Sequence, residues 1–504
     1  MIGKRTMEPT TFSTLNYTIL FVYLAAMLVI GLLFARRQAT TEDFFLGGRK
    51  MPWLAVGMSM YASLTSAVTF MALPGTAYRE NIAFIVVSFA SILVAPILVT
   101  LFYPFYRRLR VTTSYEYVDR RFGPRARSAS AGLFILARLG WLGLVIYAPS
   151  LALSVVSGIP LPVCILSMGV LATLYTVLGG MAAVIWTDVV QFILMLGGIL
   201  WLIVALSGRA PGGAAGILSF ARDSGHLHVA DWGLSLTAMS GWIVGVGYFF
   251  QLMQDYGTDQ TTVQRMMAIP KSTGVTRAIF FNAGVDFVVI GALLFIGLGL
   301  FACQAADPTL LPEGLAGDRL LPTFIVKGLP NGISGLLIAA LFAAAMSSID
   351  SGINCISTVI LCDFVRPARK TTQTEDHDLK LARLLTLGLG AFATALAFYV
   401  ASFERLIEAY THIVSLFNAP ILGLFLLGML TKRANFAGWG VGALVAIATT
   451  HAVQTYTPLH FSYQFPLALV LTVGIGYLAS LAFRRRNEPI PDGLTVWNRP
   501  PAID

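Results

Sequence analysis

Charged side chains are scarce in this chain. Asp, Glu, Lys and Arg make up 12% of its 504 residues, and 56% of the residues are apolar. Soluble domains carry about 25% charged residues, so these few charges could not cover the surface of a water-soluble protein of this length. The composition excludes a string of soluble domains and favours a single bundle embedded in lipid.

Cysteines and catalytic motifs are also scarce. The four cysteines lie in or beside apolar stretches without a CxxC pair, which is typical of small core residues rather than of metal ligands or disulfides. The sequence has no HExxH motif, no paired metal-ligand histidines and no nucleophile motif. His412 stands alone in an apolar stretch, where a packed core residue is the simpler interpretation. We therefore expect a protein that is not an enzyme.

What the chain does contain is long apolar stretches. A helix that spans a bilayer needs about 20 apolar residues, and thirteen stretches reach this length. They predict an all-α polytopic membrane protein with about thirteen transmembrane helices in one domain over residues 1–504. Their approximate ranges are 15–35, 52–77, 82–105, 129–156, 160–179, 183–206, 233–255, 275–302, 331–361, 381–401, 405–429, 436–453 and 461–483.

The basic residues lie mostly in short segments between these stretches. If the N-terminus is outside, 25 of the 34 Lys and Arg residues fall in inner loops or at the inner C-terminus, as the positive-inside rule requires. This bias supports the helix count and predicts an integral plasma (inner) membrane protein with a cytoplasmic C-terminus. It also accounts for the net charge of +9 without nucleic acid. The Pro-containing tail, 487–504, is expected to be flexible.

Four charged residues interrupt the apolar stretches: Arg138, Asp188, Asp286 and Asp350. A charge at membrane depth costs at least about 2.5–3.5 kcal/mol on insertion scales, so such residues usually mark a function. A structural role, in which they pair with one another or with backbone groups, is the alternative. The sequence leaves both explanations open.

The stretch 331–361 carries a narrow face of small polar residues. At 100° per residue, Ser347, Ser351, Ala344 and Ser348 fall within about 100° of one another. This face offers three hydroxyls and, at the small Ala344, an accessible carbonyl. Hard cations such as sodium prefer oxygen ligands, and neutral oxygens hold them weakly enough for release. Small-residue packing between membrane helices is the competing explanation.

Two stretches carry helix-breaking signals. Five of the ten residues from 61 to 70 bear hydroxyls, and Pro74-Gly75 follows. This pattern predicts an interrupted helix, although a Pro kink in a packed helix also fits it. A second interruption is expected at 254–260, five predicted helices later. Transporters use broken helices as ion and substrate sites, and the offset suits an inverted repeat of five plus five helices.

Six motifs are spread along the chain. They are Asp43-Phe44-Phe45-Leu46-Gly47-Gly48-Arg49, Ser66-Ala67 to Pro74-Gly75, Tyr147-Ala148-Pro149 with Leu151-Ala152-Leu153, Gly179-Gly180 with Ile185-Trp186-Thr187-Asp188, Gln260 through Gln264-Arg265, and Ser347-Ser348. Together they resemble the sodium:solute symporter family, and the similarity covers nearly all of the predicted helices up to 405–429. The resemblance implies a LeuT-type core of ten helices at 52–429, with peripheral helices at 15–35 and 436–483.

The resemblance also implies sodium as the coupling ion, at two sites. Asp350, beside the second site, stands where some relatives have a neutral side chain. The first site would use the carbonyls of Ala62, Thr65 and Ala344 and the hydroxyls of Ser347 and Ser348. The second would use Asp188, Ser347 and Ser351.

The same resemblance places a solute site between the predicted helices, with five expected contacts: Ser66, Thr69, Arg138, Tyr256 and Gln260. An arginine can hold a carboxylate with two directional hydrogen bonds. Arg138 therefore favours a small organic anion, such as sialic acid or a monocarboxylate. A sugar or another neutral solute stays as an alternative.

The expected function is sodium-coupled secondary active symport, in which a small solute is imported by alternating access. The expected partners are the solute, sodium ions and the lipid bilayer, and no nucleic acid; the sequence identifies no protein partner. One rival is a proton-coupled carrier of the same fold, with Asp188 or Asp350 as the proton site. Others are a membrane enzyme and an uncoupled channel or sensor.

Overall fold

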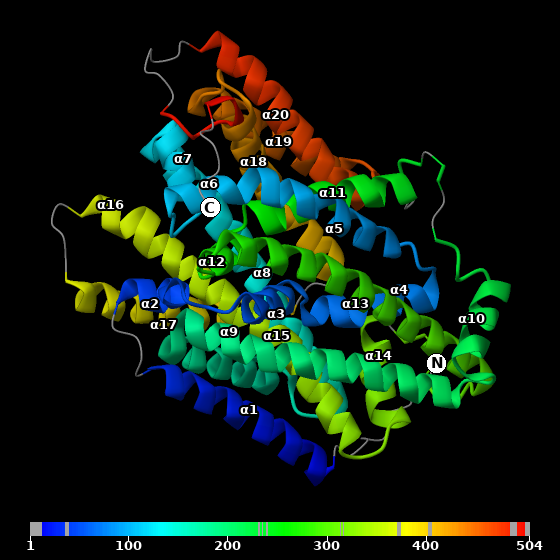
Figure 1. Ribbon diagram of the computed structural model, residues 1–504. Coiled ribbons are helices and arrows are strands. Elements are labelled where there is room, and N and C mark those ends of the chain that lie inside the picture. Colours follow the sequence, from blue (N-terminus) through cyan, green and yellow to red (C-terminus); the bar gives the residue numbers. More distant parts are fainter. Residues whose placement is uncertain are drawn as a thin grey trace.

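The protein is an all-helical bundle in the part of the chain that the structure describes (Figure 1). This computed structural model describes residues 13–35, 40–229, 232–233, 235–237, 240–312, 314–315, 317–369, 374–401, 406–483 and 491–498. Within these ranges, nine helices are long and apolar enough to cross a membrane, or ten if one bent pair counts as a single span. Helices are expected because lipid offers no hydrogen bonds to the backbone.

Large apolar side chains face outward on the helices at the edges of the bundle. Phe21, Leu444 and Leu478 are 72%, 71% and 66% exposed. Soluble monomers rarely expose contiguous apolar patches larger than about a few hundred Å². The hydrocarbon chains of a bilayer cover such a surface without a cost in free energy. The structure therefore supports the predicted integral membrane protein.

The helices follow one another as follows. The first half contains α1 (Thr14–Ala35), α2 (Thr41–Leu46), α3 (Trp53–Leu64), α4 (Ala67–Arg79), α5 (Ile85–Ile97), α6 (Tyr103–Leu109), α7 (Tyr115–Phe122), α8 (Pro124–Ser157), α9 (Leu161–Arg209) and α10 (Gly213–Asp223). The second half contains α11 (Gly241–Gly257), α12 (Gln260–Met267), α13 (Ser272–Ala306), α14 (Gly317–Gly328), α15 (Ile333–Val359), α16 (Arg366–Ala368), α17 (Glu375–Val400), α18 (Leu406–Leu430), α19 (Phe436–Tyr456) and α20 (Gln464–Ala482).

Helix α9 is divided at Gly180. Its 49 residues would form a straight helix of roughly 74 Å at 1.5 Å per residue, far longer than the hydrocarbon core of about 30 Å. Gly180 has φ 55° and ψ −164°, a conformation open almost only to glycine. The sequence predicts two separate stretches here, 160–179 and 183–206, and the break falls between them.

The predicted interruption of the 52–77 stretch is confirmed. Helices α3 and α4 meet at a bend of 63°, and Thr65 and Ser66 at the break have extended backbones. Ser66 caps α4, because its hydroxyl accepts a hydrogen bond from the Thr69 amide. Pro74 lies inside α4, so the break falls within the hydroxyl-rich segment 61–70 and not at Pro74-Gly75. The extended residues and the serine cap, not the proline, end one helix and start the next.

The second predicted interruption is confirmed. Helix α11 ends at Gly257 and α12 begins at Gln260. Asp259 lies between them and caps α12, with its Oδ1 atom accepting a hydrogen bond of 2.8 Å from the amide of Thr261. An aspartate at this position satisfies an amide that a helix start leaves without a backbone partner.

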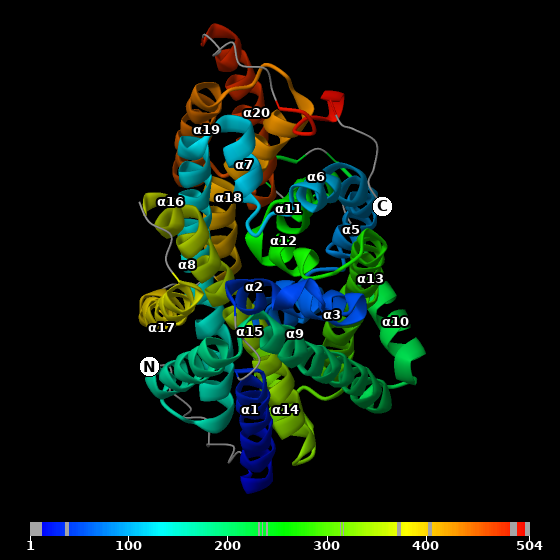
Figure 2. The ribbon, with the colours of Figure 1, turned by 60° about the vertical axis from the view of Figure 1, so that its left-hand side comes forward.

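Helix α15 forms the centre of the bundle (Figure 2). Nearly every residue from Ser334 to Val359 is buried, and α15 contacts α1, α3, α8, α9 and α17. A membrane helix that is buried on all sides is free to carry polar residues, provided that its neighbours satisfy them. This is where the serine face predicted from the sequence lies.

The connecting segments gather at two ends of the bundle (Figure 1). Helices α10 and α14 lie at one end, where Arg79 donates a 3.0 Å hydrogen bond to the Leu315 carbonyl. Helices α2 and α16 and the start of α17 lie at the other end. There Glu375 accepts a 2.9 Å hydrogen bond from the Thr41 amide, and Arg366 pairs with Asp378 at 2.8 Å. The segments predicted as outer loops thus lie together, as do those predicted as inner loops.

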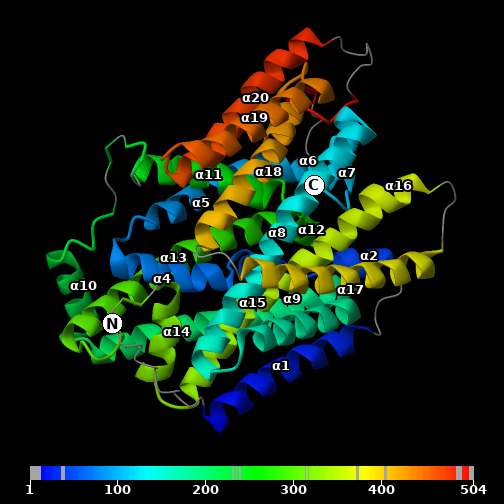
Figure 3. The ribbon, with the colours of Figure 1, turned by 180° about the vertical axis from the view of Figure 1, so that it is seen from behind.

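Helices α19 and α20 pack against each other at one edge of the bundle, and α17 lies beside α8 and α9 (Figure 3). The predicted flexible tail, 487–504, is described only at residues 491–498. There Trp497 Nε1 donates to the Leu430 carbonyl at 2.7 Å, and Tyr117 donates to the Leu494 carbonyl at 2.9 Å. This piece is therefore held against the helices rather than loose, and the rest of the tail lies outside the described residues.

Candidate functional site

The serines of α15 meet the broken end of α3. The Ser347 hydroxyl donates to the Ala62 carbonyl at 2.8 Å, and the Ser348 hydroxyl donates to the Ser63 carbonyl at 2.9 Å. Both hydroxyls also lie within 3.1–3.3 Å of the Ala344 carbonyl. The last carbonyls of a helix have no partner inside it, so the break leaves acceptors that the serines satisfy.

The structure brings the predicted first sodium ligands together. Ala62, Ala344, Ser347 and Ser348 are all buried, and Thr65 lies at the end of α3, where its amide still bonds to the Tyr61 carbonyl at 2.9 Å. The cluster consists of neutral carbonyl and hydroxyl oxygens. Such a set suits a hard monovalent cation, toward which each hydroxyl would turn a lone pair. Among the described residues, no group of His, Cys, Asp and Glu could hold a different metal.

A second cluster lies next to the first. Asp188 Oδ2 accepts hydrogen bonds from the hydroxyls of Ser59 and Ser63, at 2.6 and 3.2 Å. The hydroxyls of Ser63 and Ser351 are 2.8 Å apart, and Ser351 donates to the Ser347 carbonyl. The residues predicted for the second sodium site, Asp188, Ser347 and Ser351, are therefore close together.

Sequence reasoning missed the cation in this cluster. Arg265 is assigned to an inner loop by the charge pattern, but the structure buries it completely. It pairs with Asp188 at 3.1 Å and donates to Ser59 at 2.8 Å and to Ser351. The cause is α12, which folds back into the bundle after the break and is buried along its whole length. The Gln264-Arg265 motif was a signal, but it did not indicate this role.

Asp350 adds a second buried carboxylate to the same cluster. Its Oδ2 atom accepts from the Tyr175 hydroxyl at 2.8 Å, and its Oδ1 atom lies 3.0 Å from the Ser351 hydroxyl. Asp188 Oδ1 is buried without a hydrogen-bond partner among the described residues. The cluster thus holds two carboxyl groups and one guanidinium, which pairs with Asp188. With both carboxyl groups ionised, its formal charge is −1. Burying such an excess charge is costly unless a cation or a proton balances it.

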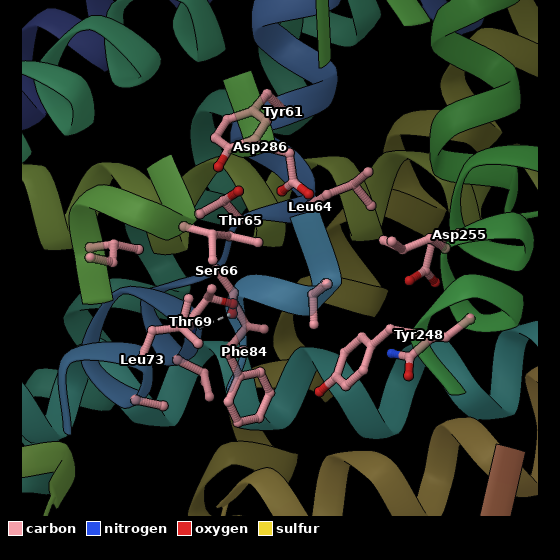
Figure 4. A pocket seen from close by; sticks show the side chains of 18 of the residues that line it. Tyr61, Leu64, Thr65, Ser66, Thr69, Leu73, Phe84, Tyr248, Asp255 and Asp286 are labelled. Atoms are coloured by element: carbon pink, nitrogen blue, oxygen red, sulfur yellow. Dashed lines mark hydrogen bonds between the residues drawn. The ribbon is translucent and has the colours of Figure 1, made fainter. Parts of the chain in front are cut away.

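A cavity of about 200 Å³ lies on the other side of the α3–α4 break (Figure 4). Four of the five predicted solute contacts line it: Ser66, Thr69, Arg138 and Tyr256. Gln260 does not. Its side chain accepts from the Ser114 amide at 2.8 Å and donates to the Thr112 carbonyl at 2.9 Å, which fixes the start of α7.

Arg138 already has a carboxylate partner. One terminal nitrogen lies 2.5 Å from Asp259 Oδ1 and 2.8 Å from the Thr261 hydroxyl. The guanidinium also lies over the Trp141 ring, 4.5 Å from its centroid, an arrangement that stabilises a cation. A solute carboxylate at Arg138 would therefore share the guanidinium with Asp259.

Two acidic residues in the cavity wall were not predicted as contacts. Asp255 comes from α11 and Asp286 comes from α13. Asp286 was noted as a charge within an apolar stretch, and this was the available signal. Asp255 was noted only as part of the 254–260 interruption. Neither signal could show that the side chains face the same cavity.

Comparisons with known proteins agree on one family. The model of the "Sodium:solute symporter family" matches residues 44–447. The "Sodium/sialic acid symporter SiaT" of Proteus mirabilis (strain HI4320) is 33% identical over 95% of this chain and 97% of its own length. The human "Sodium-coupled monocarboxylate transporter 2" is 30% identical over 92% of this chain and 76% of its own length.

Solved structures agree with these relatives. A structure described as the substrate-bound outward-open state of a Na⁺-coupled sialic acid symporter matches with a TM-score of 0.89 at 32% identity. The match covers 94% of this chain and 99% of the other. The nucleobase-cation-symport-1 family transporter Mhp1 matches with a TM-score of 0.56 at 13% identity, over 87% of this chain and 94% of the other, and this likeness shows the fold alone.

Proposed function

The chain belongs to the sodium:solute symporter family, and on that premise we propose that it imports a small organic solute together with sodium by alternating access. The observation that carries this proposal is the contact of Ser347 and Ser348 with the carbonyls that the α3 break leaves free. A transporter, not an enzyme, is the function class of its relatives.

The geometry supports a direct route for coupling. A sodium ion held by Ala62, Thr65, Ala344, Ser347 and Ser348 would join α15 to the end of α3. The next residues of the same break, Ser66 and Thr69, line the solute cavity. A sodium ion that holds the break in one conformation would therefore also position the residues that contact the solute. Coupling free energies of this kind are typically 1–3 kcal/mol and are reciprocal, so the solute would tighten sodium binding by the same factor.

The proposed solute is an organic anion such as sialic acid or a similar carboxylate. The names of the relatives support this class, as does the presence of Arg138 in the cavity wall. Ser66, Thr69 and Tyr256 line the same cavity, and their hydroxyls would supply further polar contacts.

We further propose that a second sodium ion uses Asp188, Ser347 and Ser351. Support comes from the unpartnered Oδ1 atom of Asp188 and from the extra carboxylate of Asp350, which leaves the cluster short of one positive charge. Arg265 neutralises only one of the two carboxylates. Protonation of Asp350 is the alternative, and it would lower the number of sodium ions per cycle.

For the topology we propose thirteen crossings. They are counted by treating α3 with α4, and α5 with α6, as single crossings and by dividing α9 at Gly180. The core of 52–429 would be a LeuT-type repeat of five plus five helices, with peripheral helices at 15–35 and 436–483. The two helix breaks, five crossings apart, support this arrangement, as does the gathering of the loops at two ends. The charge bias supports an outer N-terminus and a cytoplasmic C-terminus.

The cavity supports an outward-facing state. Its wall continues from the break to Thr76 on α4 and Leu293 on α13, toward the end that carries α10 and α14. On the other side, the hydroxyls of Tyr103 and Tyr106 donate to the carbonyls of Tyr256 and Gly257, both at 2.7 Å. These two bonds would have to break before the solute could leave inward.

Uptake into proteoliposomes tests the proposed function. With sodium outside and N-acetylneuraminate or pyruvate as the labelled solute, we expect accumulation above the outside concentration. Replacing sodium with choline at fixed pH should abolish it. Uptake that survives the replacement would indicate proton coupling, and uptake that never exceeds equilibration would indicate an uncoupled channel.

A further inference from the structure

The charge of the solute cavity does not match a simple anion. Among the described residues that line the cavity, the charged side chains are Arg138, Asp255 and Asp286. Arg138 is neutralised by Asp259 at 2.5 Å. Neither Asp255 nor Asp286 forms an ion pair with a basic residue of the described chain. The wall thus presents two carboxylates and one guanidinium that is already paired.

Asp286 lies beside the α3–α4 break, which forms the centre of the candidate site. Figure 4 shows its carboxyl group beside Tyr61 and Leu64, with Thr65 nearby. Its Oδ2 atom is buried and has no hydrogen-bond partner among the described residues. A buried polar atom without a partner costs about 1–3 kcal/mol, and more when the group is charged. Asp286 also lines the cavity, so a ligand that reaches its carboxyl group could supply the missing donor.

Asp255 approaches the cavity from another helix. It lies on α11 near Tyr248, away from Asp286 on α13 (Figure 4). The two carboxylates therefore belong to separate parts of the wall. A solute that contacted both α11 and α13 would touch helices on both sides of the α3–α4 break.

An anion alone would bind poorly in this cavity. Two like charges 4 Å apart repel by about 4 kcal/mol at an effective dielectric constant of 20, and Arg138 cannot offset this while it is paired with Asp259. An ammonium group on the solute would remove the conflict. It would offer up to three charge-assisted hydrogen bonds, and a donor for the unpartnered oxygen of Asp286.

We propose that the solute carries an ammonium group as well as a carboxylate, with Asp286 accepting a hydrogen bond from the ammonium, Asp255 adding negative charge from another part of the wall, and Arg138 holding the carboxylate. The proposal rests on the proposed function and specifies the solute of the same site. It changes the expected class from a plain organic anion to a small amine-bearing acid. The volume of about 200 Å³ suits such a molecule, since pockets for drug-sized ligands run to about 300–1,000 Å³.

Matched pairs of acids test the proposal on the purified full-length protein in sodium buffer. Each pair differs only in the amine: L-proline and cyclopentanecarboxylate, 4-aminobutyrate and butyrate, β-alanine and propionate, with N-acetylneuraminate and pyruvate added as plain anions. Thermal stabilisation and uptake are measured for each. We expect at least one amine-bearing acid to act at a concentration about tenfold or more below that of its partner, about 1.4 kcal/mol. Stabilisation by none of the amine-bearing acids, or an equal effect of a plain anion, would overturn the proposal.

Two isosteric variants separate ammonium binding from a structural role. Asp286→Asn and Asp255→Asn should weaken the amine-bearing acid about tenfold, leave its deaminated partner unchanged or tighter, and leave the sodium concentration for half-maximal effect unchanged. Asp223→Asn, on an exposed residue of α10, is the matched control. If both members of a pair weaken equally, the carboxylates are structural and the proposal fails. If only the pH dependence changes, a proton rather than an ammonium is bound there.

The failure of the proposed function would give a different result. If uptake of the best amine-bearing acid continues when choline replaces sodium, sodium coupling is contradicted. The preference between the two members of a pair can still be measured in that case. Sodium-dependent uptake with a preference for the deaminated acids would contradict only the ammonium assignment.

Discussion

At the scale of single residues, the candidate sodium site depends on hydroxyls that satisfy carbonyls across two helices. Ser348 contacts the Ser63 and Ala344 carbonyls, so it joins the broken end of α3 to α15. A hydroxyl in this position can donate to a carbonyl when no ion is bound and offer a lone pair when one is. Alanine can do neither.

Ser348→Ala should therefore raise the sodium concentration for half-maximal uptake by about tenfold, which corresponds to about 1.4 kcal/mol. The measurement is solute uptake against sodium concentration in proteoliposomes. Ser357→Ala is the control, because Ser357 is buried on the same helix and donates to the Ala382 carbonyl at 3.1 Å, away from the break. A folded Ser348→Ala protein with normal sodium dependence would contradict the assignment.

The buried Arg265–Asp188 pair gives a second prediction at this scale. Removing one partner of a fully buried ion pair costs about 3–5 kcal/mol, because the other charge stays buried. We expect Arg265→Met to lower the thermal unfolding temperature clearly. Lys380→Met, whose partner in an exposed pair is Asp376, with the two side chains 74% and 71% exposed, should change it little, since exposed pairs contribute about 0–1 kcal/mol. Equal effects of the two changes would show that Arg265 is not a structural anchor.

At the scale of helices, the breaks determine where backbone carbonyl groups are left without a partner inside their own helix. The α3–α4 break lies at Thr65 and Ser66, within the hydroxyl-rich segment 61–70 and before Pro74-Gly75. Pro74 packs in α4 against α13, where Gly297 is so close to the Pro74 carbonyl that a Cβ atom would come within 2.3 Å of it. Its role is therefore packing rather than interruption.

Pro74→Ala should accordingly keep sodium-dependent uptake with a sodium requirement close to that of the parent protein. The helix gains a residue with better helix propensity and loses no contact of the sodium cluster. Uptake against sodium concentration is the measurement. Loss of sodium dependence in this variant would show that Pro74 contributes to the conformation of the break.

The division of α9 at Gly180 gives another prediction at the scale of helices. Gly180→Ala would place a side chain where φ is 55° and ψ is −164°, at a cost of roughly 1–3 kcal/mol. We expect a lower yield of folded protein and a lower unfolding temperature by size-exclusion chromatography and thermal unfolding. Gly197→Ala, in the same helix where a Cβ atom meets open space, should have no such effect. Identical behaviour of the two variants would show that the backbone at Gly180 is helical.

At the scale of the whole molecule, orientation and conformational state can be tested together. The four native cysteines are buried, so introduced cysteines would report with little background. We expect Asp223→Cys on α10 and Thr76→Cys at the cavity to react with an impermeant thiol reagent from outside. Arg433→Cys, exposed between α18 and α19, should react only after permeabilisation.

The solute should protect Thr76→Cys but not Asp223→Cys, because only Thr76 lines the cavity. Reaction of Arg433→Cys from outside would reverse the proposed orientation. Failure of Thr76→Cys to react, with Asp223→Cys reactive, would show that the cavity is closed to the outside.

From the sequence alone, the class of the protein and the residues of the candidate first sodium site could be predicted. A charge content of 12% permits only a lipid-embedded bundle, and the family resemblance aligned Ala62 and Thr65 with Ala344, Ser347 and Ser348. Composition and helical periodicity are local properties, so they can be read from the sequence without knowledge of long-range contacts. The thirteen crossings and the sodium ligands themselves stay predictions.

Only the tertiary structure decided which charges meet. Arg265 lies 77 positions from Asp188 and Arg138 lies 121 positions from Asp259, and no local pattern shows that these pairs are buried together. The same holds for the cavity, whose acidic wall is made by α11 and α13. Buried charges are set by the neighbours that a fold brings to them, so the electrostatics of this transport site could be read only from the assembled helices.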